Sequence, residues 1–436
     1  MKKRSVIAAV AAMGLVTGLV ACAPADEGGP VELVIWDTGL LGKLNEDGSA
    51  ADNSFLDKAA GMYMDENPDI SIKIVQQSGD ISSNAAQFEA ASIAGNGPDI
   101  RVQYTGGPTL SFSDFFLDLS DTFDQETFDD LTGWNTVRAD YDPNGALYGL
   151  PYGSGTYFVV FVNHKLVEAA GMDPNYVPET WEDMIAMGEE YKEKSGGLNP
   201  FWVANLEGYV GAWVIGALGG GELGPDGFTA QYRGDESIDS EGMIKAYQAW
   251  ADLYASGLTN PDAGEVSNGD STSGFLQEKG AYYIVGMWED VNMNDAFGED
   301  VSSFFIPVLD GAEYPSVAAG GPVQALSITN YSEHQEEAKD FLRYLAQPEL
   351  QDLYVEMTQV EPSNSKSADA SVIQNPLLQA QAEQLKEVGD LIYPFDNVMP
   401  QSVIDLFYRV NASVFLGTMT PEEAVSQLQA ALDAER

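Results

Sequence analysis

Cysteine, histidine and basic residues are all scarce in this chain. One cysteine and two histidines occur in 436 residues, and 20 Lys and Arg stand against 68 Asp and Glu, a net charge of −48. A lone cysteine cannot form an intramolecular disulfide, and a zinc site usually draws on several His or Cys ligands. A strongly acidic surface also repels the phosphates of nucleic acid. We therefore expect no metal site, no cofactor and no nucleic-acid partner.

Sequence motifs of common catalytic sites are missing as well. No Gly-x-Ser-x-Gly elbow accompanies His164 or His334. Gly219–Gly221 lacks the Lys-Ser/Thr of a phosphate-binding loop, so we interpret these glycines as a flexible turn. A catalytic pair of carboxylates is not excluded by the sequence, because 68 acidic residues offer many pairs at a glycosidase-like separation. A hydrolase using two carboxylates is the one enzymatic alternative that remains.

The N-terminal 30 residues contain the segments of a secreted lipoprotein's leader, one after the other. Basic residues at 2–4 precede an apolar run at 6–20, which is shorter than the ~20 residues of a comfortable membrane span. Leu19-Val20-Ala21-Cys22 resembles a bacterial lipobox. It implies a signal peptide at 1–21 and lipid on Cys22, where several acyl chains would give stable anchoring. Residues 22–30 are small, charged and turn-prone, which predicts a tether.

Strand and helix signals alternate along the chain after the tether. Alternating or β-branched runs predict strands at 31–36, 70–75 and 100–104, with helices at 54–67 and 83–94 between them. This order predicts a parallel sheet covered by helices. A nearly continuous apolar run at 157–162 predicts a strand buried on both faces.

Further helix start signals occur between residue 180 and the end of the chain. Thr180 with Asp183 predicts a capping box, Ser332 predicts the cap of an amphipathic helix, and Thr420-Pro421 predicts a cap followed by proline at the first helical position. A further helix is predicted at 240–256, ending before Gly257.

Several segments resemble, in order, the extracellular solute-binding proteins of ATP-binding-cassette sugar importers, the maltose-binding-protein-like family 1. They are LVIWDTG, AASIAGNGPDI, YGLPYGSGTYFVVFVNHKLVEAAGM, PETWEDMIAMGEEY, GFLQEKGAYYIVGMW, EEAKDFLRYLAQPELQ and TPEEAVSQLQAAL. Departures occur at His164, inserted between asparagine and lysine, and at Tyr282, where the family usually has methionine. The resemblance covers nearly the whole chain after Cys22.

The resemblance implies a periplasmic-binding-protein-like α/β fold of two lobes joined by crossover strands, with a ligand cleft between them. Lobe 1 would comprise 31–151 and 306–358, and lobe 2 would comprise 152–305 and 359–436. The implied protein is a monomer, anchored by lipid at Cys22 to the outer face of the bacterial membrane. It would capture a neutral carbohydrate, expected to be an oligosaccharide, and deliver it to the permease of the importer.

Candidate ligand-binding residues follow the predicted strand ends, because ligands of open α/β sheets bind outside the carboxyl ends of the strands. Aromatic rings suit the C–H faces of a sugar, and carboxylates or amides suit its hydroxyls. The candidates at strand ends are Trp288, Glu289, Asp37, Thr38, Gln103 and Tyr104. The resemblance implies Tyr209, Trp213, Gly320 and Gly321 as further candidates, and Asp396 of the segment YPFD is expected to reach the cleft from lobe 2.

Each candidate has a plainer structural interpretation beside the functional one. Trp288 is as easily a core tryptophan next to a turn, and the spacing of Tyr209 and Trp213 is typical of core packing in a helix. Glu289 is as easily part of the acidic surface. The ligand class stays open too: a polyol or another small polar solute is the alternative to a sugar.

Overall fold

A computed structural model describes residues 30–42, 51, 54–77, 81–359, 364–388 and 390–435. The predicted signal peptide, Cys22 and the tether up to residue 29 lie outside the described residues. Among the described residues, no helix combines the length and the apolar character needed to cross a membrane.

Nine strands form one sheet in this part of the chain. They are β1 (Val31–Asp37), β2 (Ile70–Gln76), β3 (Ile100–Tyr104), β4 (Leu150–Asn163), β5 (Phe201–Trp202), β6 (Tyr282–Gly286), β7 (Val301–Phe305), β8 (Val317–Ile328) and β9 (Asp390–Ile392). Their order is β2-β1-β3-β8-β4-β6-β5, with β7 paired to β4 and β9 paired to β8.

The α-helices lie between and after these strands. They are α1 (Phe55–Glu66), α2 (Ile81–Ile93), α3 (Gly107–Leu110), α4 (Gln125–Asp130), α5 (His164–Ala169), α6 (Trp181–Lys194), α7 (Tyr209–Arg233), α8 (Glu241–Ala255), α9 (Asn268–Leu276), α10 (Asp290–Phe297), α11 (Gln335–Leu345), α12 (Pro348–Thr358), α13 (Pro376–Leu385), α14 (Phe395–Val398), α15 (Gln401–Phe415) and α16 (Pro421–Ala434). Short 3-10 helices include η2 (Trp134–Val137), η3 (Ala139–Tyr141) and η4 (Met287–Glu289).

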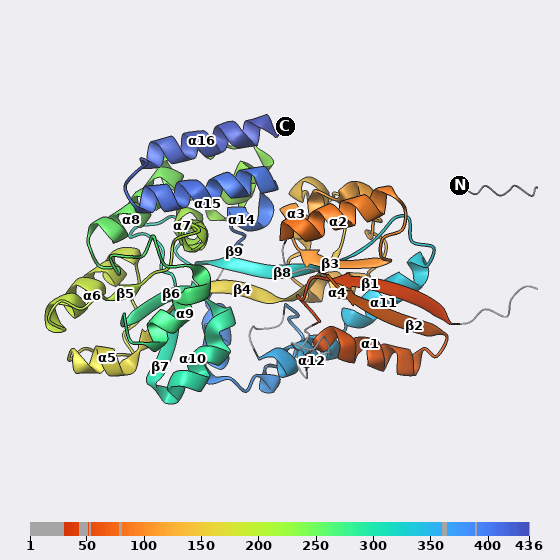
Figure 1. Cartoon of the computed structure of the whole chain (residues 1–436), viewed down its shortest axis with the longest axis horizontal. Coiled ribbons are helices and arrows are strands. Elements are labelled where there is room, and N and C mark those ends of the chain that lie inside the picture. Colours follow the sequence, from red (N-terminus) through yellow and green to blue (C-terminus); the bar gives the residue numbers. More distant parts are fainter. Residues whose placement is uncertain are drawn as a thin grey trace, which may run out of the picture.

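Two strands, β4 and β8, run between the two bodies seen in Figure 1. The first part of β4, from Leu150 to Tyr157, pairs with β8, whereas its second part pairs with β6 and β7. We call the body built on β1, β2 and β3 lobe 1 and the body built on β5, β6 and β7 lobe 2. The predicted strand at 157–162 is therefore the lobe 2 part of a longer crossover strand. The α/β prediction is confirmed.

The sheet of lobe 1 is parallel where the sequence predicts it. β1 pairs in parallel with β2 from Val31–Ile70 to Asp37–Gln76 and with β3 at Ile35–Ile100. Alternation places Leu33 and Ile35 fully out of solvent, against Phe55 and Leu56 of α1 in the same buried cluster. The carboxyl ends of β1 and β3 therefore meet at one edge of the sheet, which is where Asp37 and Tyr104 lie.

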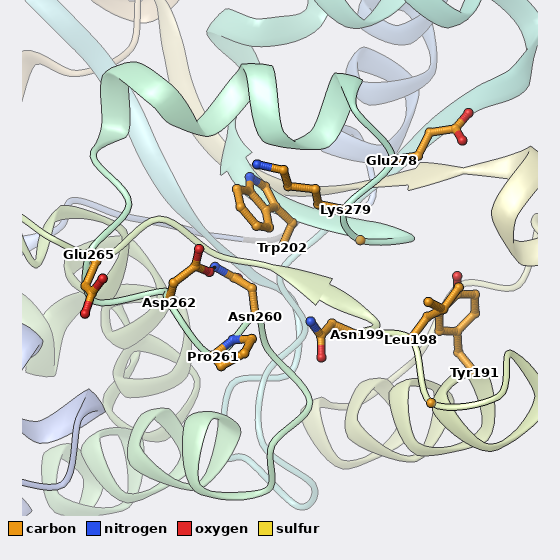
Figure 2. A pocket seen from close by; sticks show the side chains of 12 residues that line it. Tyr191, Leu198, Asn199, Trp202, Asn260, Pro261, Asp262, Glu265, Glu278 and Lys279 are labelled. Carbon is orange, nitrogen blue, oxygen red and sulfur yellow. Dashed lines mark hydrogen bonds between the residues drawn. The ribbon is translucent and has the colours of Figure 1, made fainter.

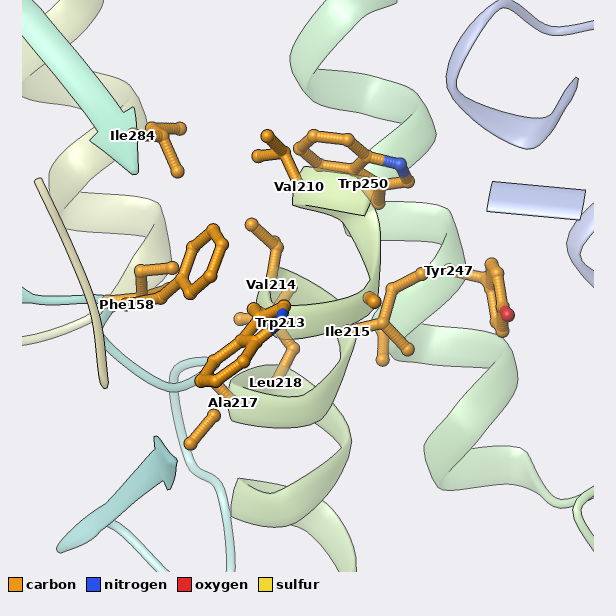
Figure 3. Close-up of a cluster of buried hydrophobic side chains, with 14 of the residues drawn as sticks. Phe158, Val210, Trp213, Val214, Ile215, Ala217, Leu218, Tyr247, Trp250 and Ile284 are labelled. Atoms are coloured by element: carbon orange, nitrogen blue, oxygen red, sulfur yellow. The ribbon is translucent and has the colours of Figure 1, made fainter. Parts of the chain in front are cut away.

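Lobe 2 has its largest buried cluster around α7. Figure 3 shows Trp213, Val214, Ile215 and Leu218 of this helix between Phe158 on β4 and Tyr247 and Trp250 on α8. All of these side chains are at most 2% exposed. The first part of α7, residues 210–221, is thus buried on all sides, which is typical of a helix enclosed by other elements.

Gly219–Gly221 is a correction to the sequence analysis, because these glycines lie inside α7 and not in a turn. An added Cβ would lie 2.8 Å from Met243 Sδ at Gly219, 2.5 Å from Ile392 Cγ1 at Gly220 and 2.8 Å from Val308 Cβ at Gly221. Three glycines in a row let the helix backbone approach neighbours on three sides. The helix is interrupted further on, at Gly224 with φ 68°.

The three predicted helix caps, at Thr180, Ser332 and Thr420, have different outcomes. The Thr420 cap is confirmed as a full capping box with Glu423, and Thr180 accepts the backbone N–H of Asp183 at 3.1 Å. Ser332 does not cap α11, which begins after His334 without a side-chain cap. Ser332 Oγ instead donates to Asp99 at 2.5 Å, and the same carboxylate accepts the backbone N–H of Val34 in β1 at 2.8 Å.

The segment before β8 packs against lobe 2. Ile306, Val308 and Leu309 belong to the α7 cluster, and the Val308 carbonyl accepts the N–H of Trp181 at 2.7 Å. These contacts favour a start of the second lobe 1 segment nearer to β8 than residue 306. The lobe boundaries themselves stay a prediction.

Candidate functional site

Trp288 lies at the carboxyl end of β6, in the 3-10 turn η4. Its indole is half-buried and forms edge-to-face contacts with Phe158, at 5.3 Å between ring centroids, and with Trp213, at 6.4 Å. Tyr209 lies at 6.1 Å in a tilted arrangement. The structure thus brings three of the predicted residues together with Phe158, which the sequence analysis did not select.

Asp396 extends this aromatic group with a buried carboxyl. Its Oδ2 accepts the indole N–H of Trp213 at 3.0 Å and the hydroxyl of Tyr408 at 3.2 Å. Its Oδ1 is buried and has no hydrogen-bond partner from the residues that the structure describes. Burial raises the pKa of Asp396 to about 7, and the two hydrogen bonds offset only part of that effect. Asp396 is therefore poised between its neutral and charged forms near neutral pH.

Asn205 is the residue of this region that the sequence analysis missed. It follows β5, which runs parallel to β6, so its backbone lies at the same sheet edge as Trp288. Its side chain is 1% exposed, and within the part of the chain that the structure describes neither the amide oxygen nor the amide nitrogen has a hydrogen-bond partner. A buried polar group without partners is costly. The available signal was its position directly after a short strand and four residues before Tyr209.

We call Phe158, Asn205, Tyr209, Trp213, Trp288, Asp396 and Tyr408 the lobe 2 group. Its members come from β4, the segment after β5, α7, η4, α14 and α15. Tyr408 is linked to Tyr209 by an edge-to-face contact at 6.0 Å. The group combines aromatic faces with an amide and a carboxyl that have unused hydrogen-bonding atoms, and it contains no ammonium or guanidinium group.

Asp37, at the end of β1, is occupied by the loop that follows it. Its carboxylate accepts the backbone N–H groups of Leu40, Leu41 and Gly42 and the side chain of Gln76. Burial raises the pKa of Asp37, and these bonds oppose the shift. Asp37 therefore shapes the edge of lobe 1 by holding the loop, whereas the buried hydroxyl of Thr38 has no hydrogen-bond partner among the described residues.

Gln103 and Tyr104 end β3 in very different surroundings. Gln103 is buried, and its amide nitrogen donates to Thr109 Oγ1 and Ser327 Oγ, at 3.2 and 2.8 Å. Tyr104 is 38% exposed, which makes it one of the few exposed large aromatic side chains. Of the two, Tyr104 has the surface that a ligand could contact.

Gly320 and Gly321 lie within β8 with φ of 149° and 151°. At Gly321 an added Cβ would come within 2.1 Å of Tyr393 Cε1. At Gly321 the close approach is thus made by a side chain of the protein itself. Glu289 is half-buried beside Trp288, and its Oε2 accepts the amide of Asn292 at 2.8 Å.

A separate pocket of about 590 Å³ opens elsewhere on lobe 2 (Figure 2). Its walls include Trp202, Asn260, Asp262 and Lys279, and none of the predicted site residues lines it. Trp202 is only 3% exposed, and the Lys279 ammonium lies 5.2 Å from its ring. The tryptophan face in this pocket is thus already covered.

Comparison with known proteins identifies the family of this chain. Residues 58–380, most of the chain, match the model described as bacterial extracellular solute-binding protein. The chain belongs to this family. The family is one of binding proteins, as the resemblance in the sequence implied.

The individual relatives and solved structures that match this chain have low sequence identity to it. The sn-glycerol-3-phosphate-binding periplasmic protein UgpB of Escherichia coli K12 is 26% identical over 263 residues, which cover 55% of this chain and 59% of that protein. The match therefore spans well under two thirds of that relative.

Two solved structures share the fold over 93% of this chain and 99% of their own. One is a chitin oligosaccharide binding protein, with TM-score 0.73 and 19% identity. The other is a cyclic alpha-maltosyl-1,6-maltose binding protein from Arthrobacter globiformis, with TM-score 0.72 and 19% identity. At this identity the likeness concerns the fold.

Proposed function

We propose that this protein is the solute-binding component of an ATP-binding-cassette importer and that it captures a neutral carbohydrate against the lobe 2 group. The observation that carries the proposal is the half-buried Trp288 against Trp213, whose indole N–H is bonded to the buried Asp396 carboxyl, together with the unused hydrogen-bonding atoms of Asp396 and Asn205 on the same lobe. Ring faces suit sugar C–H groups, and unpaired buried oxygens suit hydroxyl donors.

The charge of the group supports a neutral ligand over a phosphorylated one. Its two polar members with unused atoms are an amide and a carboxyl, and the whole chain carries a net charge of −48. A phosphate in such surroundings would lack the Arg or Lys partners that usually bind it. The relative UgpB is named for glycerol phosphate, whereas two structural neighbours are named for oligosaccharides. We therefore favour a sugar over a glycerol phosphate.

Delivery of the ligand to the importer would depend on closure of the two lobes, which β4 and β8 connect. A ligand held on lobe 2 and contacted by residues such as Tyr104 of lobe 1 would favour the closed arrangement, a population shift without catalysis. We propose that the chain acts as a monomer outside the cytoplasmic membrane, with Cys22 lipidated as its anchor, and that an importer permease recognises the closed form.

Titration calorimetry of the full chain tests the ligand class. The panel is maltotriose, chitotriose, xylotriose, glycerol and glycerol 3-phosphate. We expect saturable binding of at least one trisaccharide and none of glycerol 3-phosphate. Binding of glycerol 3-phosphate alone would overturn the carbohydrate proposal, binding of glycerol alone would favour a polyol receptor, and silence across the panel would contradict a sugar of these types.

The carboxylate-pair hydrolase is tested on the same samples. Incubation with each trisaccharide, followed by chromatography, should return the intact sugar. Continued release of smaller sugars, proportional to protein concentration, would establish the hydrolase and reject a pure binding role.

A further inference from the structure

One segment of lobe 1 reaches across to lobe 2. This segment, 138–147, is hydrogen-bonded to lobe 1 at both ends. The Leu147 carbonyl accepts the N–H of Leu119 at 2.7 Å, and just before the segment the Thr136 carbonyl accepts the N–H of Gly106 at 2.8 Å. At its tip, the Tyr141 ring packs against the α7 cluster of lobe 2. It meets Tyr232 edge to face at 5.1 Å between centroids.

The hydroxyl of Tyr141 donates to the carbonyl of Val398, the last residue of α14. Burial raises the pKa of Tyr141 well above its ordinary value, so the hydroxyl stays a donor. Asp140 and Tyr141 both have left-handed backbone conformations, with φ of 54° and 52°, which non-glycine residues adopt only where the surroundings hold them. The tip is therefore a strained lobe 1 element whose side chain is placed on lobe 2.

A second contact with α14 comes from the backbone after β3. A methyl group on Gly106 would lie 1.6 Å from the Asn397 carbonyl oxygen, and one on Gly107 would lie 2.1 Å from the Met399 carbonyl oxygen. Only the absence of side chains permits this approach. Lobe 1 thus touches three successive residues of lobe 2, at 397, 398 and 399.

The same short helix carries Asp396, which bonds Trp213 and Tyr408. We propose that Tyr141 and Gly106–Gly107 form an interlobe latch on α14, and that this latch positions Asp396 and limits how far the two lobes separate. Tyr141 is in this sense a positioning residue. The latch is a property of the chain without any sugar, so it stands or falls separately from the choice of ligand.

Three variants test the latch in the full-length chain. Tyr141→Phe removes only the hydroxyl, Tyr141→Ala removes the ring as well, and Gly107→Ala adds a methyl group against the Met399 carbonyl. Gly61→Ala is the matched control, because a Cβ at this α1 position meets nothing within 4 Å. Small-angle X-ray scattering gives the radius of gyration, and hydrogen–deuterium exchange reports on peptides from each lobe.

We expect Tyr141→Ala and Gly107→Ala to increase the radius of gyration and to accelerate exchange in peptides covering 104–112 and 395–400. For Tyr141→Phe we expect roughly fivefold faster exchange at 397–399, the effect of one lost hydrogen bond. Peptides of α8 and α16, and every peptide of Gly61→Ala, should exchange as in the unmodified chain.

The latch is refuted by unchanged scattering and unchanged exchange at 395–400 in both Tyr141→Ala and Gly107→Ala. It is also refuted if exchange rises equally across both lobes with a lower Tm, since that pattern describes general destabilisation. Gly107→Ala keeps the test valid if Tyr141→Ala fails to fold, because Gly107 has no left-handed φ to strain.

Discussion

The indole of Trp288 lies directly over Gly286, so that a methyl group on Gly286 would come within 1.9 Å of the Trp288 Cζ3 atom. A glycine two residues before the tryptophan therefore decides where its ring rests. The ring also forms edge-to-face contacts with Phe158 and Trp213 and a tilted contact with Tyr209. This packing explains why the side chain is half-buried and not enclosed.

Gly286→Ala should move the Trp288 ring without removing it. The backbone φ of −84° accepts alanine, so the main effect is the clash with the indole. We expect sugar affinity to fall about tenfold or more, which corresponds to ~1.4 kcal/mol, together with a changed near-ultraviolet circular dichroism spectrum. Gly269→Ala is the control, because its nearest atom is 3.9 Å away. Unchanged affinity beside a changed spectrum would separate Trp288 from the ligand.

Trp288→Ala should weaken sugar binding by roughly 1–3 kcal/mol, as expected of an aromatic anchor. The loss in the free energy of unfolding should stay below the ~3–5 kcal/mol of a fully buried tryptophan. Trp134→Ala is a matched control, because Trp134 is also half-buried in an aromatic cluster, 4.7 Å from Phe128. The control should lose similar stability and bind normally. Equal affinity in both variants would make Trp288 a packing residue only.

Asn205→Ala should separate binding from stability. Removing a buried amide without partners should leave the free energy of unfolding within ~0.5 kcal/mol or raise it, while sugar affinity falls. Asn163→Ala gives the contrast: Asn163 is also buried, but its Oδ1 caps α5 by accepting the N–H of Leu166 at 3.2 Å. That variant should lose ~1 kcal/mol of stability and no affinity. Urea unfolding and calorimetry measure both quantities.

Asp396 should make stability fall as pH rises from about 4 to about 7. Its folded pKa of about 7 exceeds the ordinary value of 3.8, so the folded protein binds the proton over this window while the unfolded chain has released it. The contribution of Asp396 to the free energy of unfolding is fully present below pH 4, and up to ~4 kcal/mol of it is lost above pH 7. Asp396→Asn removes it.

Urea unfolding of the unmodified chain and of Asp396→Asn, at pH 5 and pH 8, isolates this effect. Other titrating groups, including Asp37, are common to both proteins and cancel in the difference. The stability gained by the unmodified chain on going from pH 8 to pH 5 should exceed that of the variant. An equal change in both would mean that the carboxyl is hydrated in solution.

Local patterns in the sequence were sufficient for most of the elements. The alternation of Val31–Trp36 and Ile70–Val75 produced the predicted parallel pair, and Thr420 formed the predicted cap with proline at the first helical position. Such features depend on neighbours a few residues apart. The interpretation of Gly219–Gly221 as a turn was wrong because the glycine signal is local, whereas the reason for the glycines lies in Met243, Ile392 and Val308.

The candidate site shows the same division. Position after a strand end pointed to Trp288, the family resemblance pointed to Tyr209 and Trp213, and the YPFD segment pointed to Asp396. The structure links these four through ring contacts and one hydrogen bond. Position could not show that the carboxylate of Asp37 is taken up by its own loop, nor that Asn205 has an amide without partners. Those are questions of which donors reach which acceptors, and the answers depend on the folded chain.

The sequence by itself determined an α/β chain with strand-end aromatics, a strongly acidic surface and membership signals of a solute-binding family. Hydrophobic periodicity and turn chemistry act over a few residues, so they can be read along the chain. Only the tertiary structure decided that Trp213 and Asp396, 183 residues apart, share a hydrogen bond, and that Tyr141 of one lobe rests on the other. Burial, pKa and interlobe contact arise when distant segments exclude water together, and no local pattern specifies them.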